Sequence, residues 1–235
     1  MKRQKITNNH LNPPLIRGNK SCLIICDGEL NKGLLNRFLK QNESPHLKII
    51  SCDGASNFLC RYKIIPDYII GDFDAVKATV LKYYKAKGVS IKKIRNQNTN
   101  DLEKALNLAL SKKLKKIFII GATGKRLDHI INNLSVIKRY SLKADIKFYD
   151  KTFEIFFLNK STEFEYRKSE VVSLLALPKA SGIKTQGLKW KLNNGTLEFG
   201  NRQGALNIAN SNYVKVKIGS GDLLVFRKHF GRIKL

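Results

Sequence analysis

Acidic residues are scarce in this chain, which has 18 Asp and Glu against 44 Lys and Arg and a formal net charge of +26. It also lacks any apolar run near the roughly 20 residues that a membrane-spanning helix needs, which argues against a membrane protein. Residues 1–20 are basic and polar and contain no apolar segment of the kind that a signal peptide requires. We therefore expect a cytoplasmic protein with a poorly ordered tail over residues 1–20.

Cysteines with metal-binding spacing are absent as well. The four cysteines are Cys22, Cys26, Cys52 and Cys60, and no two of them form a CxxC pair. The four histidines are scattered along the chain and offer no zinc-ligand spacing. Because three of the cysteines lie in or beside apolar runs, we expect buried, reduced thiols rather than disulfides or a zinc site.

The excess of positive charge has two interpretations. Basic proteins often bind nucleic acids, because Lys and Arg neutralise phosphates. Here the lysines are spread along the whole chain, and neither an aromatic RNA-binding segment nor zinc-finger spacing accompanies them. We favour a solvated basic surface that helps to attract an anionic substrate, and we expect no specific nucleic acid partner. A nucleic-acid-binding protein is the alternative.

A regular alternation of patterns occupies the first 150 residues of this 235-residue chain, in which short apolar strands follow helical segments. The expected strands span residues 22–26, 48–52, 68–70, 117–120 and 146–149. The expected helices span residues 32–40, 76–87, 101–111 and about 127–140. This alternation predicts an α/β domain over residues 21–158. Its mostly parallel sheet would be flanked by helices and would bind ligands beyond the carboxyl ends of its strands.

The pattern changes after Asp150, where short apolar segments are separated by turns that contain Gly, Asn or Pro. The expected strands span residues 153–158, 164–167, 171–177, 197–199, 213–218 and 223–227. No convincing helical pattern accompanies them. This favours a second, all-β domain over residues 162–235, a small sandwich or barrel, of which the sandwich is our prediction.

Two carboxylates follow the apolar run at residues 68–70. The run ends at Gly71, and Asp72 and Asp74 come next with one residue between them. If this segment stays extended, the two side chains point to the same side and repel each other unless a cation lies between them. In a chain so poor in acids, this pair suggests a site for Mg²⁺.

Other aspartates follow the ends of predicted strands or begin a helix. Asp53 follows an apolar strand, Asp128 follows a strand and its glycine turn, and Asp101 opens a helix. Taken singly, each has an ordinary explanation: a turn residue for Asp53, a helix cap for Asp101 and a helix-dipole partner for Asp128. In a parallel sheet, however, all of these positions converge on one edge. Together with the first pair they favour a metal–phosphate site.

A glycine-rich segment, Gly121-Ala122-Thr123-Gly124, lies between a predicted strand and a predicted helix. Glycines let the backbone approach a ligand closely, and the N–H groups at a helix N-terminus attract anions. The segment does not match a Walker motif, so on its own it is a weak signal. Arg126 follows it, and a forked, permanently charged guanidinium suits a phosphate better than a lysine would.

Five segments, in this order along the chain, resemble thiamine pyrophosphokinases. They are residues 51–57, 66–75, 97–106, 121–129 with Asn133, and 187–190. The resemblance extends from about residue 22 to residue 227. Five motifs in a fixed order are far more specific than any one of them.

The resemblance implies an α/β domain, a β-sandwich domain for substrate binding and dimerisation, and a homodimer with a shared active site. It implies transfer of a pyrophosphoryl group from ATP to the thiamine hydroxyl, with AMP as the second product. Carried over by motif, the catalytic residues are Asp72, Asp74, Asp101 and Asp128, of which the first three hold Mg²⁺. The nucleotide-binding residues are Asp53, Gln97, Gly124 and Arg126. Trp190 and Asn210 contact thiamine.

Three segments depart from the family pattern. Gly54-Ala55 replaces a double glycine, residues 96–101 have lost two possible carboxylates, and residues 207–210 keep the final Asn210 but neither serine. The last change leaves room for a pyrophosphokinase that uses a different alcohol, which is a further alternative. Trp190, the only tryptophan, also has a structural alternative as a core or interface anchor.

Overall fold

The computed structural model describes residues 20–229, so the tail expected over residues 1–20 lies outside the described residues except for Lys20. Strands and helices alternate first, in the order β1 (Ser21–Ile25), α1 (Lys32–Gln41), β2 (Leu47–Cys52), α2 (Ala55–Arg61), β3 (Tyr68–Gly71), α3 (Ala78–Ala86), β4 (Ser90–Lys93), α4 (Asp101–Ser111), β5 (Lys116–Ile120), α5 (Leu127–Ser141) and β6 (Asp145–Tyr149). Strands alone follow: β7 (Phe153–Leu158), β8 (Ser161–Glu165), β9 (Val171–Gln186), β10 (Gly195–Glu198), β11 (Gly204–Ile208), β12 (Tyr213–Lys217) and β13 (Ser220–Lys228).

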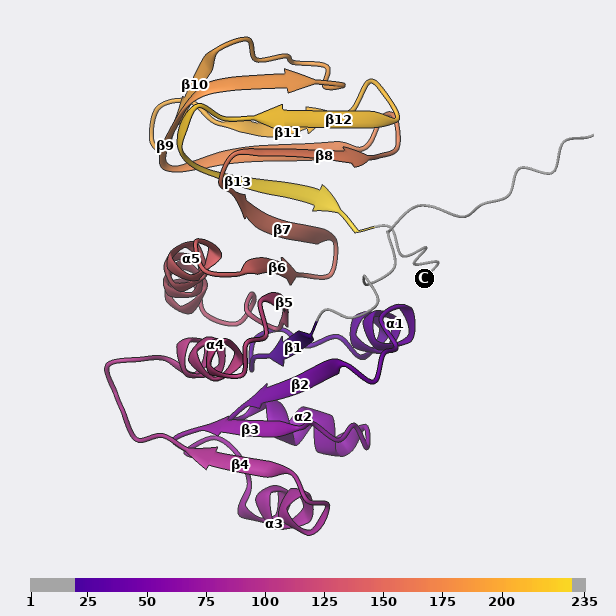
Figure 1. The fold of residues 1–235 in the computed structure, drawn as a ribbon, viewed down its shortest axis with the longest axis vertical. Helices are drawn as coiled ribbons and strands as arrows, with labels where there is room; N and C mark the ends of the chain where they lie inside the picture. Colours follow the sequence, from indigo (N-terminus) through magenta and orange to yellow (C-terminus); the bar gives the residue numbers. More distant parts are fainter. Residues whose placement is uncertain (1–19, 230–235) are drawn as a thin grey trace, which may run out of the picture.

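Strand pairing is continuous through both parts of the molecule (Figure 1). The order across the sheet is β4-β3-β2-β1-β5-β6-β7-β13-β9-β12-β8, with β10 and β11 paired to β9. Neighbours from β4 to β6 are parallel, whereas β6 and β7 and the strands beyond them pair antiparallel. The predicted α/β part followed by a mostly β part is confirmed. Because β7 pairs with both β6 and β13, strand pairing crosses the expected boundary, and the division into two domains stays a prediction.

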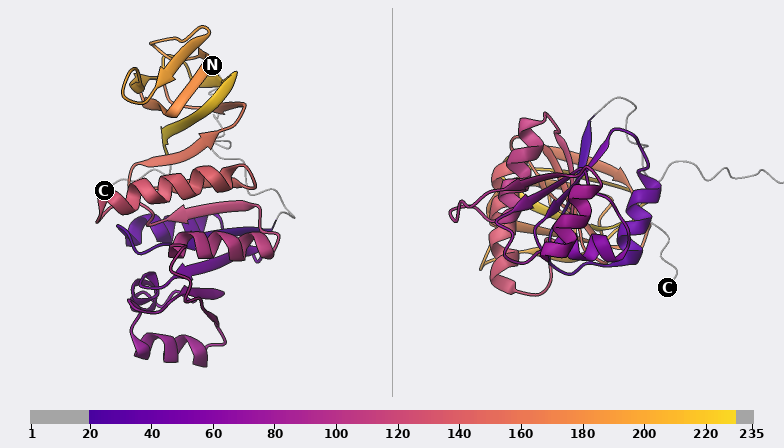
Figure 2. Two further views of the ribbon diagram at one scale, coloured as in Figure 1. Left: turned by 90° about the vertical axis from the view of Figure 1, so that its left-hand side faces the viewer. Right: turned by 90° about the horizontal axis from the view of Figure 1, so that it is seen from below.

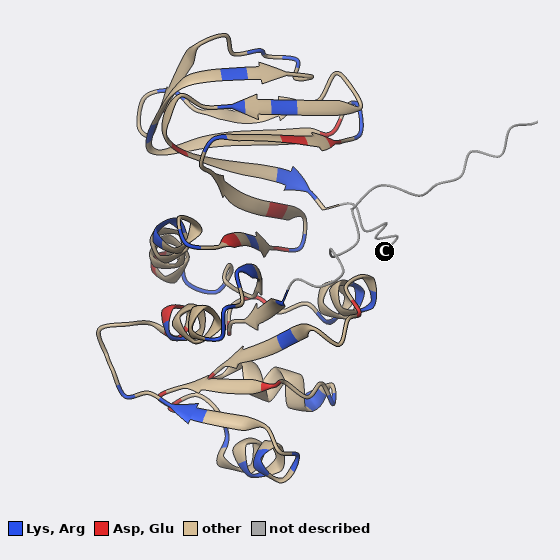
Figure 3. Ribbon diagram, viewed as in Figure 1, with Lys and Arg blue, Asp and Glu red and all other residues tan. Residues whose placement is uncertain are grey.

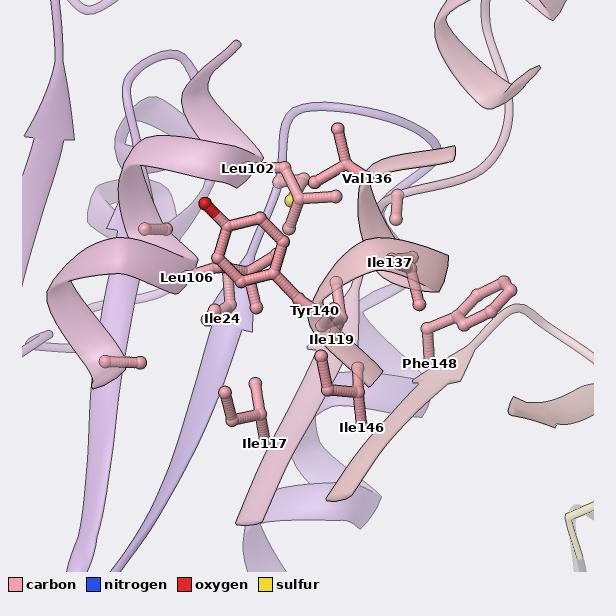
Figure 4. Packing of buried hydrophobic residues seen from close by; sticks show 14 of the residues in the cluster. Ile24, Leu102, Leu106, Ile117, Ile119, Val136, Ile137, Tyr140, Ile146 and Phe148 are labelled. Carbon is pink, nitrogen blue, oxygen red and sulfur yellow. The ribbon is translucent and has the colours of Figure 1, made fainter. Parts of the chain in front are cut away.

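Helices cover both faces of the parallel sheet (Figures 1 and 2). Within β1, Cys22 and Ile24 belong to the core beneath α4 and α5, whereas Leu23 and Ile25 belong to the core beneath α1, α2 and α3. Figure 4 shows the first core, in which Tyr140 of α5 lies among side chains of α4 and the strands. Side chains alternate across a strand, so two covered faces require a continuous apolar run.

The helices create a switch point between the neighbouring strands β1 and β5. α1 follows β1 and lies on one face of the sheet, whereas α5 follows β5 and lies on the other (Figure 1). The loops after these two strands therefore leave adjacent strand ends in opposite directions. Open α/β sheets bind their ligands in the crevice that forms at such a point.

A separate core fills the C-terminal β region, by which we mean β7–β13. β9 supplies the largest share of its buried apolar side chains, and β7, β12 and β13 contribute further ones. Where this region joins the parallel sheet, the buried carboxylate of Glu154 in β7 pairs with Lys147 of β6 at 2.7 Å and with Arg227 of β13 at 3.0 Å. Burial acts to raise the pKa of Glu154, but the two cations outweigh it and lower the pKa, so the junction holds a compensated charge.

The sequence predictions omit α2, β4 and β11. α2 is short and contains Ser, Asn and Cys, which are modest helix formers, and the buried Leu59 ties it to the core. β4 is a polar edge strand with the sequence Ser90-Ile91-Lys92-Lys93, and charged edges protect a sheet from further pairing. Tertiary context rather than local pattern decides these elements.

Several strand predictions in the C-terminal β region are wrong in extent, among them the strand expected over residues 223–227, which spans Ser220–Lys228. The strand expected over residues 171–177 continues to Gln186, because Pro178 lies where the register between β9 and β13 shifts. A proline is tolerated at such an irregularity, since no ladder N–H is required there. The strand expected over residues 164–167 is instead β8, which pairs with β12 from Ser161 to Glu165.

None of the helices in residues 20–229 is long and apolar enough to cross a membrane. All four cysteines are free, and Cys22, Cys26 and Cys52 are buried. The expectation of reduced, largely buried thiols is therefore confirmed.

Candidate active site

Three aspartates from separate segments meet at the carboxyl edge of the parallel sheet. Asp53 follows β2, Asp72 follows β3, and Asp101 opens α4. One carboxylate oxygen from each lies within 4.8 Å of the other two. Asp53 is buried and the other two are partly exposed, so solvent reaches the group. The parallel pairing of β2 with β3 brings their ends side by side and so produces this convergence.

Asp53 anchors the loop that follows β3. Its carboxylate accepts hydrogen bonds from the backbone N–H groups of Val76 at 2.9 Å and Ala75 at 3.2 Å, and its side chain is also hydrogen-bonded to Asp74. A Cβ at Gly71 would come within 2.8 Å of the Asp53 Cβ, so only glycine allows this close approach. Asp53, which directly follows β2, therefore fixes the loop that carries Asp72 and Asp74.

Burial and crowding shift the pKa values of these aspartates in different directions. Burial, aided by the hydrogen bond to Asp74, raises the pKa of Asp53 to about 6, although two backbone N–H groups oppose the shift. Burial likewise raises the pKa of Asp101 against the lowering effect of Lys104. Burial acts in the same sense on Asp72, but the charge of Lys104 and several hydrogen bonds outweigh it and lower the pKa. Close carboxylates thus compete for protons.

Two further side chains contact the cluster. Gln97, a predicted nucleotide-binding residue, donates from Nε2 to Asp72 Oδ2 at 3.4 Å. Lys104 of α4 is buried and donates from Nζ to Asp101 Oδ1 at 3.0 Å. The sequence prediction omits Lys104, although it stands inside the motif at residues 97–106. Nothing in the apolar periodicity of that helix marks its lysine as buried.

Two asparagines connect α4 to the glycine-rich loop. Asn100 caps α4 by accepting from the Glu103 N–H at 2.8 Å, and its Nδ2 donates to Asn133 Oδ1 at 3.0 Å. Asn133 Nδ2 in turn donates to the Ala122 carbonyl at 2.8 Å. The helix that carries Asp101 and the loop after β5 are therefore linked through Asn133 of α5.

The loops after β1 and β5 border a cavity of about 390 Å³ at the switch point. It is lined by Asp27, Gly28, Glu29, Leu30, Phe58 and Lys125. The Gly28 N–H donates to the Gly121 carbonyl at 2.8 Å, and Gly121 has a φ of +78°, which side chains rarely adopt. A Cβ at Gly124, a predicted nucleotide-binding residue, would come within 2.4 Å of the Glu29 Cβ. Glycines are thus required where the two loops touch.

Arg126 and Asp128 form an ion pair with each other at the start of α5. Both side chains are largely exposed, and the Arg126 Nε donates to Asp128 Oδ1 at 3.1 Å. These hydrogen bonds lower the pKa of Asp128 to about 2. In this conformation the guanidinium faces Asp128, and the expected contacts of both residues with a nucleotide stay predictions.

The predicted thiamine contacts lie in the C-terminal β region. Trp190 stands between β9 and β10 with 54% of its surface exposed, and the Lys189 Nζ lies 4.9 Å from its ring centroid. The buried Asn207 binds the Trp190 backbone on both sides, accepting from its N–H at 3.1 Å and donating to its carbonyl at 2.7 Å. Asn210 is exposed, and its N–H donates to the Gly187 carbonyl at 3.0 Å. An open aromatic face is thus carried on a fixed backbone.

Asp27 and Lys125 are further residues that the sequence prediction omits. Asp27 follows β1 and precedes Gly28, which is the same strand-Asp-Gly pattern that marks Asp53 and could have identified it. A Cβ at Gly54 would lie within 2.7 Å of Asp27 Oδ2, so the turns after β1 and β2 adjoin. The Lys125 Nζ lies 3.2 Å from the same Asp27 oxygen.

Two family models match consecutive parts of the chain. Residues 39–149 match the catalytic domain of thiamin pyrophosphokinase, and residues 160–223 match its vitamin B1 binding domain. The first match contains the acidic cluster, and the second contains Trp190 and Asn207.

Curated relatives agree with these matches. Thiamine pyrophosphokinase 1 of Oryza sativa subsp. japonica is 29% identical over 191 residues, which cover 75% of this chain and 70% of the relative. Thiamine pyrophosphokinase 2 of the same plant is 30% identical over 70% of this chain and 66% of the relative. The chain thus spans about two thirds of the length of these relatives.

Solved structures show the same fold. Yeast thiamin pyrophosphokinase superposes with a TM-score of 0.78 at 19% identity, covering 97% of this chain and 95% of that one. Thiamine pyrophosphokinase from Bacillus subtilis gives a TM-score of 0.77 at 23% identity, covering 89% of this chain and 100% of that one. At these identities the likeness establishes the fold.

Proposed function

Because the chain belongs to the thiamine pyrophosphokinase family, we propose that it transfers a pyrophosphoryl group from ATP to the hydroxyl of thiamine, giving thiamine diphosphate and AMP. The observation that carries the proposal is the convergence of Asp53, Asp72 and Asp101 at the edge of the sheet. In a protein with a net charge of +26, three close carboxylates are best explained by a divalent ion and the polyphosphate that it accompanies.

The donor set of the cluster suits Mg²⁺, which prefers oxygen ligands and enters sites with one or two carboxylates and substrate phosphates. Asp53, Asp72 and Asp101 would hold it, with Asp74 hydrogen-bonded beside them. The sequence analysis expects a different ligand set, which consists of Asp72, Asp74 and Asp101. The two sets differ by one residue, and experiment must decide between them. When bound, Mg²⁺ supplies positive charge that offsets the charge of the transferred phosphoryl groups.

The nucleotide would lie at the switch point between β1 and β5. The cavity there is bordered by the glycine-rich loop, which leads into the N-terminus of α5, a favourable place for phosphate oxygens. The oxygen of the thiamine hydroxyl would then attack the β-phosphorus: a new O–P bond forms, the bond from the β-phosphorus to the bridging oxygen of AMP breaks, and the hydroxyl proton is released to solvent. The task of Gln97, Arg126 and Asp128 is to orient the chain of phosphates for this in-line displacement.

Thiamine would stack on Trp190. More than half of the Trp190 surface is exposed, and the ammonium of Lys189 occupies a cation–π position over its ring. The positively charged ring of thiamine presents the same kind of partner, and such a contact contributes about 0.5–2 kcal/mol. Asn210 is the polar residue proposed beside it.

The enzyme would act as a homodimer with a shared site. In Figure 1 the segment between β9 and β10, which carries Trp190, belongs to the end of the molecule opposite β3 and β4. A second copy would bring its exposed Trp190 ring, here called the aromatic platform, to the first copy. There the ring would meet Asp53, Asp72 and Asp101 at the carboxyl edge of the parallel sheet, here called the acidic edge. Exposed apolar side chains at Leu127, Ile131 and Leu206 offer surface for this contact, and each has at least 60% of its surface exposed.

The cytoplasm is the proposed compartment. The four free cysteines suit a reducing environment, where thiols persist. ATP, the proposed pyrophosphoryl donor, is also a cytoplasmic metabolite.

Incubation with ATP, Mg²⁺ and thiamine tests the proposal, with AMP and thiamine diphosphate as the expected products. Formation of ADP instead would indicate a simple kinase. AMP that forms only when thiamine is replaced by another alcohol would favour the pyrophosphokinase of different specificity.

The nucleic-acid alternative has a separate readout. Figure 3 shows Lys and Arg distributed over helices and strands of both parts of the chain rather than along one element. Tight binding of single-stranded or duplex nucleic acid that weakens steeply with salt, without any AMP formed, would favour that alternative.

A further inference from the structure

Lys104 is a charged residue placed where charge is costly. Its side chain is only 4% exposed, and it lies in α4 between the buried residues Leu102 and Ala105. A buried ammonium is costly to remove from water unless an opposite charge compensates it. The partner is Asp101, whose Oδ1 lies 3.0 Å from the Lys104 Nζ.

The position of Lys104 relates it to the whole acidic cluster. Asp101 has an oxygen within 4.8 Å of oxygens of both Asp53 and Asp72, so the ammonium adjoins a group of three carboxylates. A single buried cation therefore faces several anions that would otherwise repel one another.

We propose that Lys104 is an internal counter-ion of the acidic cluster, which holds the Asp101 carboxylate in place and makes the cluster stable before a divalent ion arrives. It is a positioning residue, because it acts through Asp101. The inference deepens the proposed function and rests on the divalent-ion site that this function requires. The alternative is a salt bridge that only fastens α4 to the sheet.

The two roles predict opposite effects on ion binding. Without the lysine charge, the cluster carries one more net negative charge, so a divalent ion should bind more tightly while the ion-free protein becomes less stable. A lysine that only fastens the helix would lower stability by the same amount with and without the ion. Its loss would leave ion affinity unchanged or weaker.

The experiment uses Lys104→Met, which keeps the length and apolar stem of the side chain. Mn²⁺ binding to the full chain is measured directly by calorimetry, without substrates, and thermal unfolding is followed with Mg²⁺ and with a chelator. We expect Mn²⁺ affinity to rise roughly tenfold. The melting temperature should fall with the chelator, and excess Mg²⁺ should restore most of the loss. Lys104→Arg, which keeps the charge, should bind Mn²⁺ much as the wild type does.

Lys147→Met is the control, because Lys147 is a partly buried lysine paired with a buried carboxylate, at 2.7 Å from Glu154, away from the acidic cluster. It should lower the melting temperature equally with Mg²⁺ and with the chelator, and it should leave Mn²⁺ affinity unchanged. The same behaviour in Lys104→Met would overturn the proposal, as would weaker Mn²⁺ binding.

Failure to fold is also informative. If Lys104→Met does not fold, Lys104→Gln is measured in the same way, and failure of both in excess Mg²⁺ would overturn the proposal because the ion should replace the missing charge. A wild-type protein that forms AMP but binds no free Mn²⁺ would defeat the inference alone. One that binds Mn²⁺ but forms no AMP would defeat the proposed function alone.

Discussion

The acidic edge of the parallel sheet and the aromatic platform of the C-terminal β region are assembled in different ways. At the edge, each acidic side chain has its own partner: Asp53 accepts from backbone N–H groups of the loop after β3, Gln97 donates to Asp72, and Lys104 donates to Asp101. On the platform, hydrogen bonds hold only the backbone of Trp190, while its ring is about half exposed and contacts the Lys189 ammonium. Close carboxylates must be arranged in advance because they repel one another, whereas a stacking surface needs only an open face.

Asp72→Asn breaks the acidic edge and should have the largest effect. Loss of one charged ligand from the cluster should lower turnover by more than about 100-fold, since even residues that only support metal ligands cost 10- to 100-fold. Asp72 is partly exposed, so the melting temperature should stay close to that of the wild type. AMP formation and thermal unfolding are measured on the same preparation.

Asp145→Asn provides the matched charge control. Asp145 is exposed at the start of β6, the end of the strand remote from the carboxyl edge. The substitution should leave turnover unchanged. An Asp72→Asn protein that melts early yet keeps its specific activity would show that the cluster is structural.

Trp190→Ala tests the platform and should have the second largest effect. Loss of about 0.5–2 kcal/mol of stacking corresponds to a rise of roughly 2- to 30-fold in the KM for thiamine. The KM for ATP should not change, because ATP is assigned to the other region. Phe199→Ala, which removes another exposed aromatic residue from the C-terminal β region, is the control and should alter neither constant. Equal losses for thiamine and ATP would mean that Trp190 acts as a structural anchor.

The two regions also differ in how far the sequence predicts them. α4 is found at the predicted residues, 101–111, because its apolar spacing and its Asn100 cap agree. The strand ends that carry aspartates at the acidic edge are close to their predicted positions, since continuous apolar runs mark them clearly. The extension of β9 through Pro178 is not predictable, because it depends on a register shift against β13.

Side-chain pairing at the acidic edge lies beyond local pattern as well. The burial of Lys104 depends on how α4 is rotated against the sheet. Arg126 and Asp128 are both exposed, so their side chains can adopt conformations that pair with each other or with other groups. Spacing along the chain encodes neither. Asp27 is the exception, because its place after β1 repeats the pattern at Asp53 and could have been found.

The pH dependence of ligand binding should also distinguish the two regions, and it is the smallest of the expected effects. The pKa of Asp53 is raised from its ordinary 3.8 to about 6, chiefly by burial and then by the hydrogen bond to Asp74. The folded, ion-free protein therefore holds this proton more tightly than the unfolded chain does. The resulting stabilisation is fully present below the unfolded pKa and is lost as the pH rises through about 6.

A divalent ion must displace the same proton, so lowering the pH should weaken its binding. Because Asp53 is already about half protonated at pH 6, we expect Mn²⁺ affinity to fall about fivefold between pH 6 and pH 5. Calorimetric titrations across this range measure the effect, and Trp190 fluorescence follows thiamine binding in parallel. Thiamine is assigned to stacking on Trp190, whose indole does not titrate, so thiamine affinity should change less than Mn²⁺ affinity. Mn²⁺ binding that is independent of pH between about 5 and 7 would mean that Asp53 does not contact the ion, and the ligand set would then be Asp72, Asp74 and Asp101.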